Sequence, residues 1–145
     1  MSLQEKPYKL VSLKQLKEDH SWEEKVEITK NLMEKFMDLT KDRAPAHVEA
    51  DYAVKMGYDG CLVHGFLVGC GYSRILGMFL PGGNTVIHQL HLDMIAPVYV
   101  GDIITYQVCI DRVIDAVKSV KLKLSAVNQD GMVVNRGTAV CVFRL

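Results

Sequence analysis

Two kinds of hydrophobic spacing divide the chain near residue 84. Before it, apolar residues recur every three or four positions, which is typical of a helix with one buried face. Thr29 is a suitable N-cap for the first such stripe, formed by Leu32, Met33, Phe36, Met37 and Leu39. This helix is expected to end before Pro45, and a shorter one is expected over 48–56 with Gly57 just beyond it. The first third of the chain therefore reads as helical.

A long apolar segment follows, with the sequence CLVHGFLVGCGYSRILGMFL at residues 61–80. It approaches the length of a membrane span, but Arg74 lies near its middle, where a charge costs about 2.5–3.5 kcal/mol on insertion scales. A helix buried by its own protein explains the composition better, from about Gly65 to Phe79. Its glycines cost helical stability and are tolerated where another element must approach the helix backbone closely.

After residue 84 the hydrophobic period changes to two, which predicts strands. The expected strands are Thr85–Asp93, Val98–Ile110, Val117–Asn128 and Met132–Leu145, with Asp130-Gly131 as a hairpin turn between the last two. The predicted fold class is α+β, a single hot-dog domain over residues 1–145, in which an antiparallel sheet of about five strands wraps around the long helix. Uncovered sheet edges in such a layer favour pairing with a second copy, so a homodimer is expected.

The composition of the chain limits the kinds of molecule that it is expected to bind. The chain has 145 residues, 49% of them hydrophobic, and 17 basic against 17 acidic side chains, as in one ordinary soluble domain. A net charge of zero gives no field that would attract nucleic acid or an anionic membrane, so few local groups must hold any anionic ligand. The four cysteines lie in apolar surroundings without a CxxC motif, and the first twenty residues are polar. We therefore expect reduced core cysteines and a cytoplasmic protein without a signal peptide.

Several chemistries are disfavoured by spacing. His88 and His91 are three apart, an odd separation that directs strand side chains to opposite faces, so no metal centre is expected. Gly69-Cys70-Gly71 lacks the third glycine of a dinucleotide fingerprint, and the rest of the chain reads as strands. A GxSxG nucleophile motif is absent from the sequence.

The strongest candidate pair is Asp42 and His47, five residues apart around Pro45 in a break between helices. Loops of this kind can direct two side chains into one cleft, and functional residues are frequent in them. A histidine titrates near neutral pH and a carboxylate can orient it, so the pair could bind one water molecule and move its proton. The alternative is that Asp42 caps the following turn and His47 is an ordinary surface residue.

A second candidate is the pair His64-Gly65, where the long helix is expected to begin. The first N–H groups of a helix have no intrahelical partner, and together with the helix dipole they can stabilise an oxyanion. The alternative is that His64 only caps the helix.

Taken together, these segments resemble the MaoC-like family of (R)-specific enoyl-CoA hydratases, which are hot-dog proteins. The resemblance runs from about Phe36 to the C-terminus in five ordered blocks: TKDRAPAH at 40–47, Tyr52-Ala53, LVHGF at 62–66, LPG at 80–82 and APVYVGD at 96–102. Five linked blocks are more specific than any one of them.

The resemblance implies roles for the matched positions. Asp42 and His47 would hold and activate the catalytic water, and the Gly65 amide would serve the thioester oxygen. His64 would shape this turn, and Ser73 would support the water or Asp42. Two departures stand out, because Lys41 replaces the usual glycine of the first block and Ala44 replaces its usual asparagine.

The implied reaction is the reversible hydration of a trans-2-enoyl thioester to the (R)-3-hydroxyacyl thioester. No cofactor is expected beyond the coenzyme A or acyl-carrier pantetheine of the substrate itself. Bulky residues that could limit the acyl chain are Met56, Tyr58, Phe66 and Tyr72, and cations that could meet coenzyme A phosphates are Lys41, Arg43 and Arg74.

Two other functions stay open at this stage. The chain could be a non-catalytic acyl-thioester-binding partner subunit of a dehydratase, which Lys41 and Ala44 would favour. A hot-dog thioesterase is less compatible, because such enzymes commonly use a carboxylate on the central helix and residues 65–79 contain no Asp or Glu.

Overall fold

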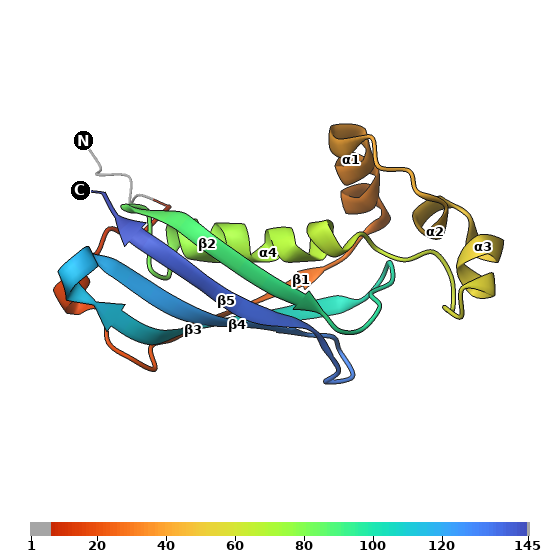
Figure 1. Ribbon diagram of the computed structural model, residues 1–145. Helices are drawn as coiled ribbons and strands as arrows, with labels where there is room; N and C mark the ends of the chain where they lie inside the picture. Colours follow the sequence, from red (N-terminus) through yellow and green to blue (C-terminus); the bar gives the residue numbers. More distant parts are fainter. Residues whose placement is uncertain (1–6, 145) are drawn as a thin grey trace.

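The computed structural model describes residues 7–144. Its centre is one five-stranded antiparallel sheet curved around a long helix, α4 (Gly65–Met78), as Figure 1 shows. Along the sheet the strands follow the order β1 (Ser21–Glu27), β3 (Ile103–Ile114), β4 (Ser119–Val127), β5 (Val133–Phe143) and β2 (Thr85–Met94). This is the α+β hot-dog architecture that the change of period predicts.

The four strands predicted after residue 84 are confirmed, with shifted ends. The turn between β4 and β5 is closed by the Asn128 N–H, which donates to the Met132 carbonyl over 2.9 Å, while Gly131 takes a φ of +77°. The strand expected from Val98 begins only at Ile103, because Gly101 turns the chain with a φ of +98°. The turn before β4 is a short 3₁₀ helix, Asp115–Val117.

The expectation that the first third is wholly helical is wrong. A 3₁₀ turn at Leu13–Gln15 is followed by β1, which pairs with β3 so that Trp22 lies opposite Val108. Exposure alternates strictly along β1, the signature of a half-buried strand. Glutamate and lysine favour helices and supply most of its exposed positions, so the short alternation is easily overlooked.

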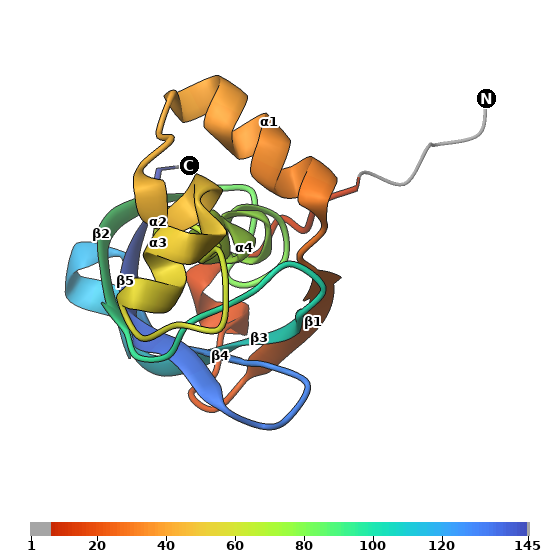
Figure 2. The ribbon, with the colours of Figure 1, turned by 90° about the vertical axis from the view of Figure 1, so that its right-hand side faces the viewer.

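The first predicted helix is confirmed as α1 (Lys30–Thr40), with the Thr29 hydroxyl accepting a hydrogen bond from the Leu32 N–H at 3.2 Å. The helix expected over 48–56 is instead two short ones, α2 (Pro45–Val48) and α3 (Ala50–Lys55), interrupted at Glu49. Proline at the first helical position starts α2 earlier than expected, since its fixed φ suits that site. Figures 1 and 2 show α1–α3 together at the end of the molecule where α4 begins.

The core lies between α4 and the inner face of the sheet. Gly71 of α4 has the buried Tyr106 ring directly against it, so that a Cβ at this position would overlap the ring. The close approach that was inferred from the glycines is thus seen at Gly71. Within residues 7–144, no helix is long and apolar enough to cross a membrane. The core residues with essentially no exposure include Ile75, Leu76, Ile104, Val108, Ile110, Val120 and Leu122.

The cysteines do not all belong to the core as expected. Cys141 is buried, and burial raises the pKa of its thiol to about 11. Cys61 and Cys109 are half-buried, but Cys70 is exposed on α4, so the core assignment is wrong for this residue. Its face of the helix points toward a surface cavity beside β2 instead of into the sheet.

The two edges of the sheet differ in polarity. At the β1 edge the exposed positions are mostly charged, with Glu23, Lys25 and Glu27 among them. At the β2 edge the exposed side chains include Val86, Ile87, Leu90 and Met94. Charged edges resist strand pairing and apolar ones invite it, so β2 is the edge suited to an interface.

Candidate active site

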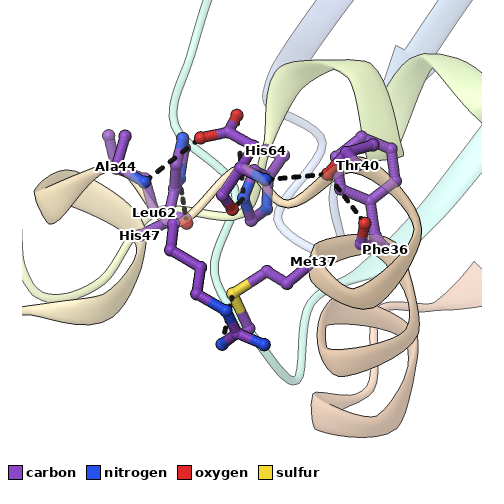
Figure 3. A network of polar contacts seen from close by, with 9 residues as sticks. Phe36, Met37, Thr40, Ala44, His47, Leu62 and His64 are labelled. Carbon is purple, nitrogen blue, oxygen red and sulfur yellow. Dashed lines mark hydrogen bonds and ion pairs between the residues drawn. The ribbon is translucent and has the colours of Figure 1, made fainter.

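The loop that carries Asp42 is fastened to the end of α1. Thr40 Oγ1 donates to the Phe36 carbonyl at 2.8 Å and accepts from the Asp42 N–H at 3.2 Å, as Figure 3 shows around Thr40 and Phe36. Lys41 ends the helix in the left-handed region with a φ of 62°, the conformation for which glycine is preferred. This conformation accounts for a glycine at the matching position of the resembling family.

The Asp42 carboxylate has one oxygen engaged and one facing the site. Oδ1 accepts a hydrogen bond from the Ala44 N–H at 3.1 Å, so the capping contact foreseen for Asp42 does form. Oδ2 lies 4.0 Å from the Nε2 of His64, and the side chain is 48% exposed. The contact with Ala44 therefore orients the carboxylate and leaves Oδ2 available to a ligand.

His47 is half-buried at the end of α2 and is held by the chain that leads into α4. Its Nδ1 lies 2.8 Å from the Leu62 carbonyl oxygen (Figure 3). A carbonyl can only accept, so Nδ1 carries the proton and Nε2 keeps a lone pair. His47 is thus a fixed proton acceptor at the wall of a cavity, which an ordinary surface histidine would not be.

His64 ties these two residues together. Its ring stacks on His47 with a centroid separation of 3.8 Å, while Phe36 packs at 4.9 Å from it. Its Nε2 donates to the backbone carbonyl of Asp42 over 3.0 Å. The side chain is only 2% exposed. His64 does occupy the N-cap position of α4, but its side chain makes no capping bond and contacts Asp42 and His47 instead, so it does more than cap the helix. His64 is a support between the loop and His47, in keeping with the shaping role that was expected for it.

Gly65 is the first residue of α4, and it lines the same cavity as His47. The N–H groups of the first helical turn have no partner inside the helix and carry the positive end of the dipole. A Cβ added at Gly65 would lie 3.5 Å from the thioether of Met94, an ordinary contact distance. His47 and Gly65 therefore line one cavity, and the Asp42 carboxylate lies close to the His47 ring.

This cavity has a volume of about 390 Å³, within the usual range for small-molecule sites. Most of its wall is apolar, and His47, Tyr58 and Asn135 supply polar side chains to it. The lining residues are His47, Tyr58, Leu62, Val63, Gly65, Val68, Met94, Ile95, Ala96, Pro97, Val98, Val134 and Asn135. An apolar chain with a reactive polar end is the kind of ligand that fits such a wall.

The residues expected to limit an acyl chain are dispersed. Tyr58 lines the site cavity, whereas Met56 is exposed at the end of α3. Phe66 is 82% exposed and Tyr72 is buried beneath the same region, and both line a second cavity of about 440 Å³ between α4 and β2. Ser73 also lines this second cavity, so the structure does not bring it together with Asp42 and His47.

The expected phosphate-binding cations are partly engaged elsewhere. Arg43 donates to the Asp38 carboxylate at 3.1 Å. Arg74 pairs with Glu24 of β1 and lies over the Phe79 ring at 4.8 Å. Lys41 is exposed beside the site. Of the three, Lys41 and Arg43 lie on the loop that carries Asp42.

Within the described part of the chain, one group of side chains has the spacing needed for a metal ion. Asp42, His47 and His64 each offer a ligand atom, and these atoms lie within 4.8 Å of one another. The His64 Nε2–H and the His47 Nδ1–H are donated to backbone carbonyls, so only the opposite ring nitrogens could bind a cation. Two of these three residues, Asp42 and His47, are also the candidate proton-transfer pair.

Sequence reasoning missed two participants. One is the Leu62 carbonyl, which sets the tautomer of His47. Because it is a backbone group, the residue type at position 62 gives no sign of this role. The other is Asn135, a fully buried amide in the cavity wall. Its position did carry a signal, because Asn135, Ala139 and Cys141 share the inward face of β5 and only Asn135 is polar.

The chain is similar to known hydratases and dehydratases. A family model described as "MaoC like domain" matches residues 12–130. The mitochondrial 3-hydroxyacyl-[acyl-carrier-protein] dehydratase FERN of Solanum lycopersicum is 34% identical over 110 residues, which cover 74% of this chain and 66% of that protein. An (R)-specific enoyl-CoA hydratase of Rhodospirillum rubrum is 33% identical over 104 residues, 72% of each chain.

Coverage differs among these relatives. The chain spans 66% of the tomato protein's length and 39% of a mitochondrial 3-hydroxyacyl-[acyl-carrier-protein] dehydratase from Arabidopsis thaliana.

Solved structures agree on the fold. The (R)-hydratase from A. caviae involved in PHA biosynthesis superposes with a TM-score of 0.84 at 24% identity, covering 90% of this chain and 98% of that one. The ChsH1-ChsH2 complex from Mycobacterium tuberculosis matches with a TM-score of 0.74 at 20% identity, covering 88% and 98%. Because the family model covers well over half of its length, the chain belongs to the MaoC-like family of hot-dog proteins.

Proposed function

We propose that this protein catalyses the reversible hydration of trans-2-enoyl thioesters to (R)-3-hydroxyacyl thioesters. The observation that carries the proposal is the fixed tautomer of His47, which lines one cavity with Gly65 at the start of α4 and lies close to Asp42. The relatives whose names describe enoyl-CoA hydratases and hydroxyacyl dehydratases support the same chemistry.

In the proposed reaction, a water molecule is held between the Asp42 carboxylate and His47 Nε2. His47 accepts a proton from the water as its oxygen forms a bond to C3 of the enoyl group. The negative charge that develops on the thioester oxygen is met by the Gly65 N–H at the positive end of α4. The proton that His47 accepted from the water is then delivered to C2 on the same face, which returns His47 to its neutral form, so water adds across the double bond with no other product.

The supporting residues act through these groups. His64 keeps the Asp42 loop and the His47 ring in register through one hydrogen bond and one stacking contact. Ser73 is not used in this mechanism because it lines the other cavity. Coenzyme A or acyl-carrier pantetheine enters as part of the substrate, and the cytoplasmic location inferred from sequence stays a prediction.

The test is a hydration assay on the purified protein with crotonyl-CoA and longer enoyl-CoAs, read as loss of enoyl absorbance. We expect turnover, and we expect it to persist after dialysis against EDTA, because the proposed steps need only the side chains named. Loss of activity with EDTA that zinc restores would replace the water held by Asp42 and His47 with a metal-bound one. Binding without turnover would favour the non-catalytic partner subunit, and release of free thiol would favour a thioesterase.

The carrier is tested in the same assay. Enoyl groups on coenzyme A and on acyl-carrier protein present the same pantetheine arm and differ only at the entrance. We expect coenzyme A thioesters to be accepted, since Lys41 and Arg43 lie on the loop at the site. A preference for the protein carrier would assign that entrance to a protein surface instead.

We further propose that two copies of the chain pair across β2. The exposed apolar side chains of this edge continue into the second cavity, and Met94 of β2 lines both cavities, so a partner there would border the site. Light scattering should give about twice the chain mass of 16.3 kDa. Leu90→Lys should shift the protein toward monomer, while the matched control Leu39→Lys on α1 should not, because Leu39 is equally apolar but lies away from the edge. A monomeric wild type would end this assignment.

A further inference from the structure

Asn135 is an unusual side chain for the middle of a hot-dog core. It lies on β5 opposite Ala126 of β4, next to a bulge at Val134 that leaves both Val134 and Asn135 buried. Its exposed fraction is 0%, and it lines the same cavity as His47 and Gly65. Asn135 therefore belongs to the wall of the candidate active site, and its side chain is shielded from bulk water.

One half of this amide is satisfied within the protein. The Tyr72 hydroxyl donates to Asn135 Oδ1 over 2.6 Å. Burial, and secondarily the neighbouring Tyr106, raises the pKa of Tyr72 above its ordinary value, so the phenol keeps its proton and acts as the donor. Tyr106 cannot compete for the amide, because its own hydroxyl donates to the Val68 carbonyl at 2.6 Å. Tyr72 thus fixes the orientation of the amide, with Oδ1 as acceptor.

The other half has no partner. Asn135 Nδ2 is one of two buried side-chain polar atoms in the described part of the chain without a hydrogen bond, the other being His64 Nδ1. An unpartnered buried N–H is destabilising, and folded proteins contain few of them. A leucine, which has the same branching pattern but no polar atoms, would avoid this cost in an apolar wall. Polar groups placed singly in a mostly apolar cavity are the ones that orient a ligand.

The position of the amide selects the part of the ligand that it meets. Gly65, Val68 and Tyr72 follow one another along the same face of α4, and Tyr72 lies roughly 10 Å along the helix axis from Gly65. A tyrosine on a helix leans back toward the N-terminus, which brings its hydroxyl and the bonded amide toward Val68. In a cavity that holds the reacting carbons near Gly65, Asn135 would therefore lie beside the acyl chain beyond those carbons and not beside the thioester.

We propose that Asn135 Nδ2 donates a hydrogen bond to an oxygen atom carried by the acyl chain of the substrate beyond C3. The protein would then select oxygen-bearing acyl thioesters, such as ethers, ketones or hydroxy compounds, over plain alkyl ones. This assignment rests on the proposed function, because it takes the cavity to be the acyl-binding site. Asn135 is a specificity-determining residue in this view, and Tyr72 is a positioning residue that acts through it.

The test uses a matched series of octanoyl-CoA analogues in which one CH₂ at a time, from C4 outward, is replaced by an ether oxygen. An ether can only accept a hydrogen bond, so it reports on a donor in the wall. Isothermal titration on the wild type should show one position that binds roughly tenfold more tightly than the all-carbon chain. Equal affinities for all members of the series would overturn the proposal. That is the result expected if a water molecule alone accepts the hydrogen bond from Asn135.

Variants test whether the Asn135 amide causes the preference for an oxygen-bearing chain. Asn135→Leu should abolish the preference for oxygen, and Tyr72→Phe should reduce it because Oδ1 loses the donor that fixes the amide. Asn31→Leu, the same change on the exposed face of α1, should keep the full preference. The preference is a ratio measured within each variant, so a general loss of affinity does not imitate it. If Asn135→Leu fails to fold, the wild-type series and Tyr72→Phe decide the matter.

Hydration of crotonyl-CoA, measured on the same preparations, separates this proposal from the proposed function. An active wild type with equal affinities across the series overturns the role of Asn135 alone. An oxygen preference without hydration supports Asn135 and contradicts the reaction. No binding of any acyl-CoA overturns both.

Discussion

The helical segment over residues 29–60 and the sheet with α4 are held together in different ways. In the sheet and α4, side chains such as Ile75, Ile104 and Val108 have no exposure, and close packing together with the regular backbone hydrogen bonds fixes their positions. In the helical segment Met33, Met37 and Ala53 are buried, while Leu39, Val48, Tyr52 and Val54 are exposed. Asp42 and His47 belong to this second region, so a few polar contacts position the chemistry that the first region does not provide.

The difference implies that function and stability can be changed separately. A residue of the loop contributes little buried area, and its loss removes few packing contacts. A residue between α4 and the sheet has no such freedom, because interiors are close-packed. The predictions below test this separation, beginning with the largest expected effect.

Asp42→Asn and His47→Ala should each lower kcat for hydration of crotonyl-CoA by roughly 10²–10⁴-fold, because each removes a proton-transfer group. Their melting temperatures should stay close to that of the wild type, since both side chains are partly exposed. Enoyl-CoA kinetics and thermal melts on the same samples check both halves. Near-normal turnover in either variant would remove that residue from the mechanism, and a large fall in melting temperature would contradict the separation.

Gly71→Ala should destabilise the protein by about 2 kcal/mol or more, because the new methyl group would overlap the Tyr106 ring in a packed interior. The matched control is Gly77→Ala on the same helix, where a Cβ meets nothing within 4 Å. That change should stabilise the helix by up to about 1 kcal/mol. Chemical denaturation gives both values, and equal effects at the two positions would refute the close approach of sheet and helix.

Ala44→Asn should stabilise the protein by about 0.5–1 kcal/mol, because Ala44 is the N-cap of α2 and makes no side-chain capping bond. The new amide oxygen would accept from the Ala46 N–H, because Pro45 has no N–H and the His47 N–H already donates to the Ala44 carbonyl at 2.8 Å. Ala44→Val lacks an acceptor and serves as the control. A destabilised Ala44→Asn variant would show that the loop cannot accommodate the cap.

Lys41→Gly should have a similarly small effect, a gain of roughly 0.5–1 kcal/mol, because glycine adopts the left-handed conformation without steric cost but loses more chain entropy on folding. For a domain of this size, the melting temperature should rise by a few degrees at most. Lys41→Ala keeps a Cβ and should give no such rise. If the alanine variant gained as much as the glycine one, relief of the left-handed strain would not be the cause.

The same comparison explains which parts of the molecule could be predicted from sequence. In the sheet and α4, apolar residues recur with a regular period, so the sequence predicts these elements and their order along the chain. The exception is β1. There, the helix-favouring glutamates and the lysine of residues 23–27 hide the alternation around Trp22 and Val26. In the helical segment over residues 29–60, the predicted helix ends differ from the observed ones. The helices stop at Lys41 and Glu49 because of backbone conformations that cannot be predicted from the side-chain types there.

The candidate site was predictable only as far as it is local. Asp42 and His47 are five residues apart in one loop, and a sequence motif can record such a pair. The stacking of His64 on His47 and the bond from His47 to the Leu62 carbonyl join segments that meet only in the fold. Asn135 enters from β5, near the other end of the chain, so its place in the cavity depends on the sheet order.

The Leu62 carbonyl leaves His47 with a single nitrogen that can exchange protons with a ligand. In the proposed reaction this one atom takes the proton from water during hydration and must return it to the departing hydroxyl during dehydration. Both directions then pass through the same protonated intermediate of the protein, with the same neighbours. The site itself has no preferred direction, and the ratio of enoyl to hydroxyacyl thioester around it decides which way the reaction runs.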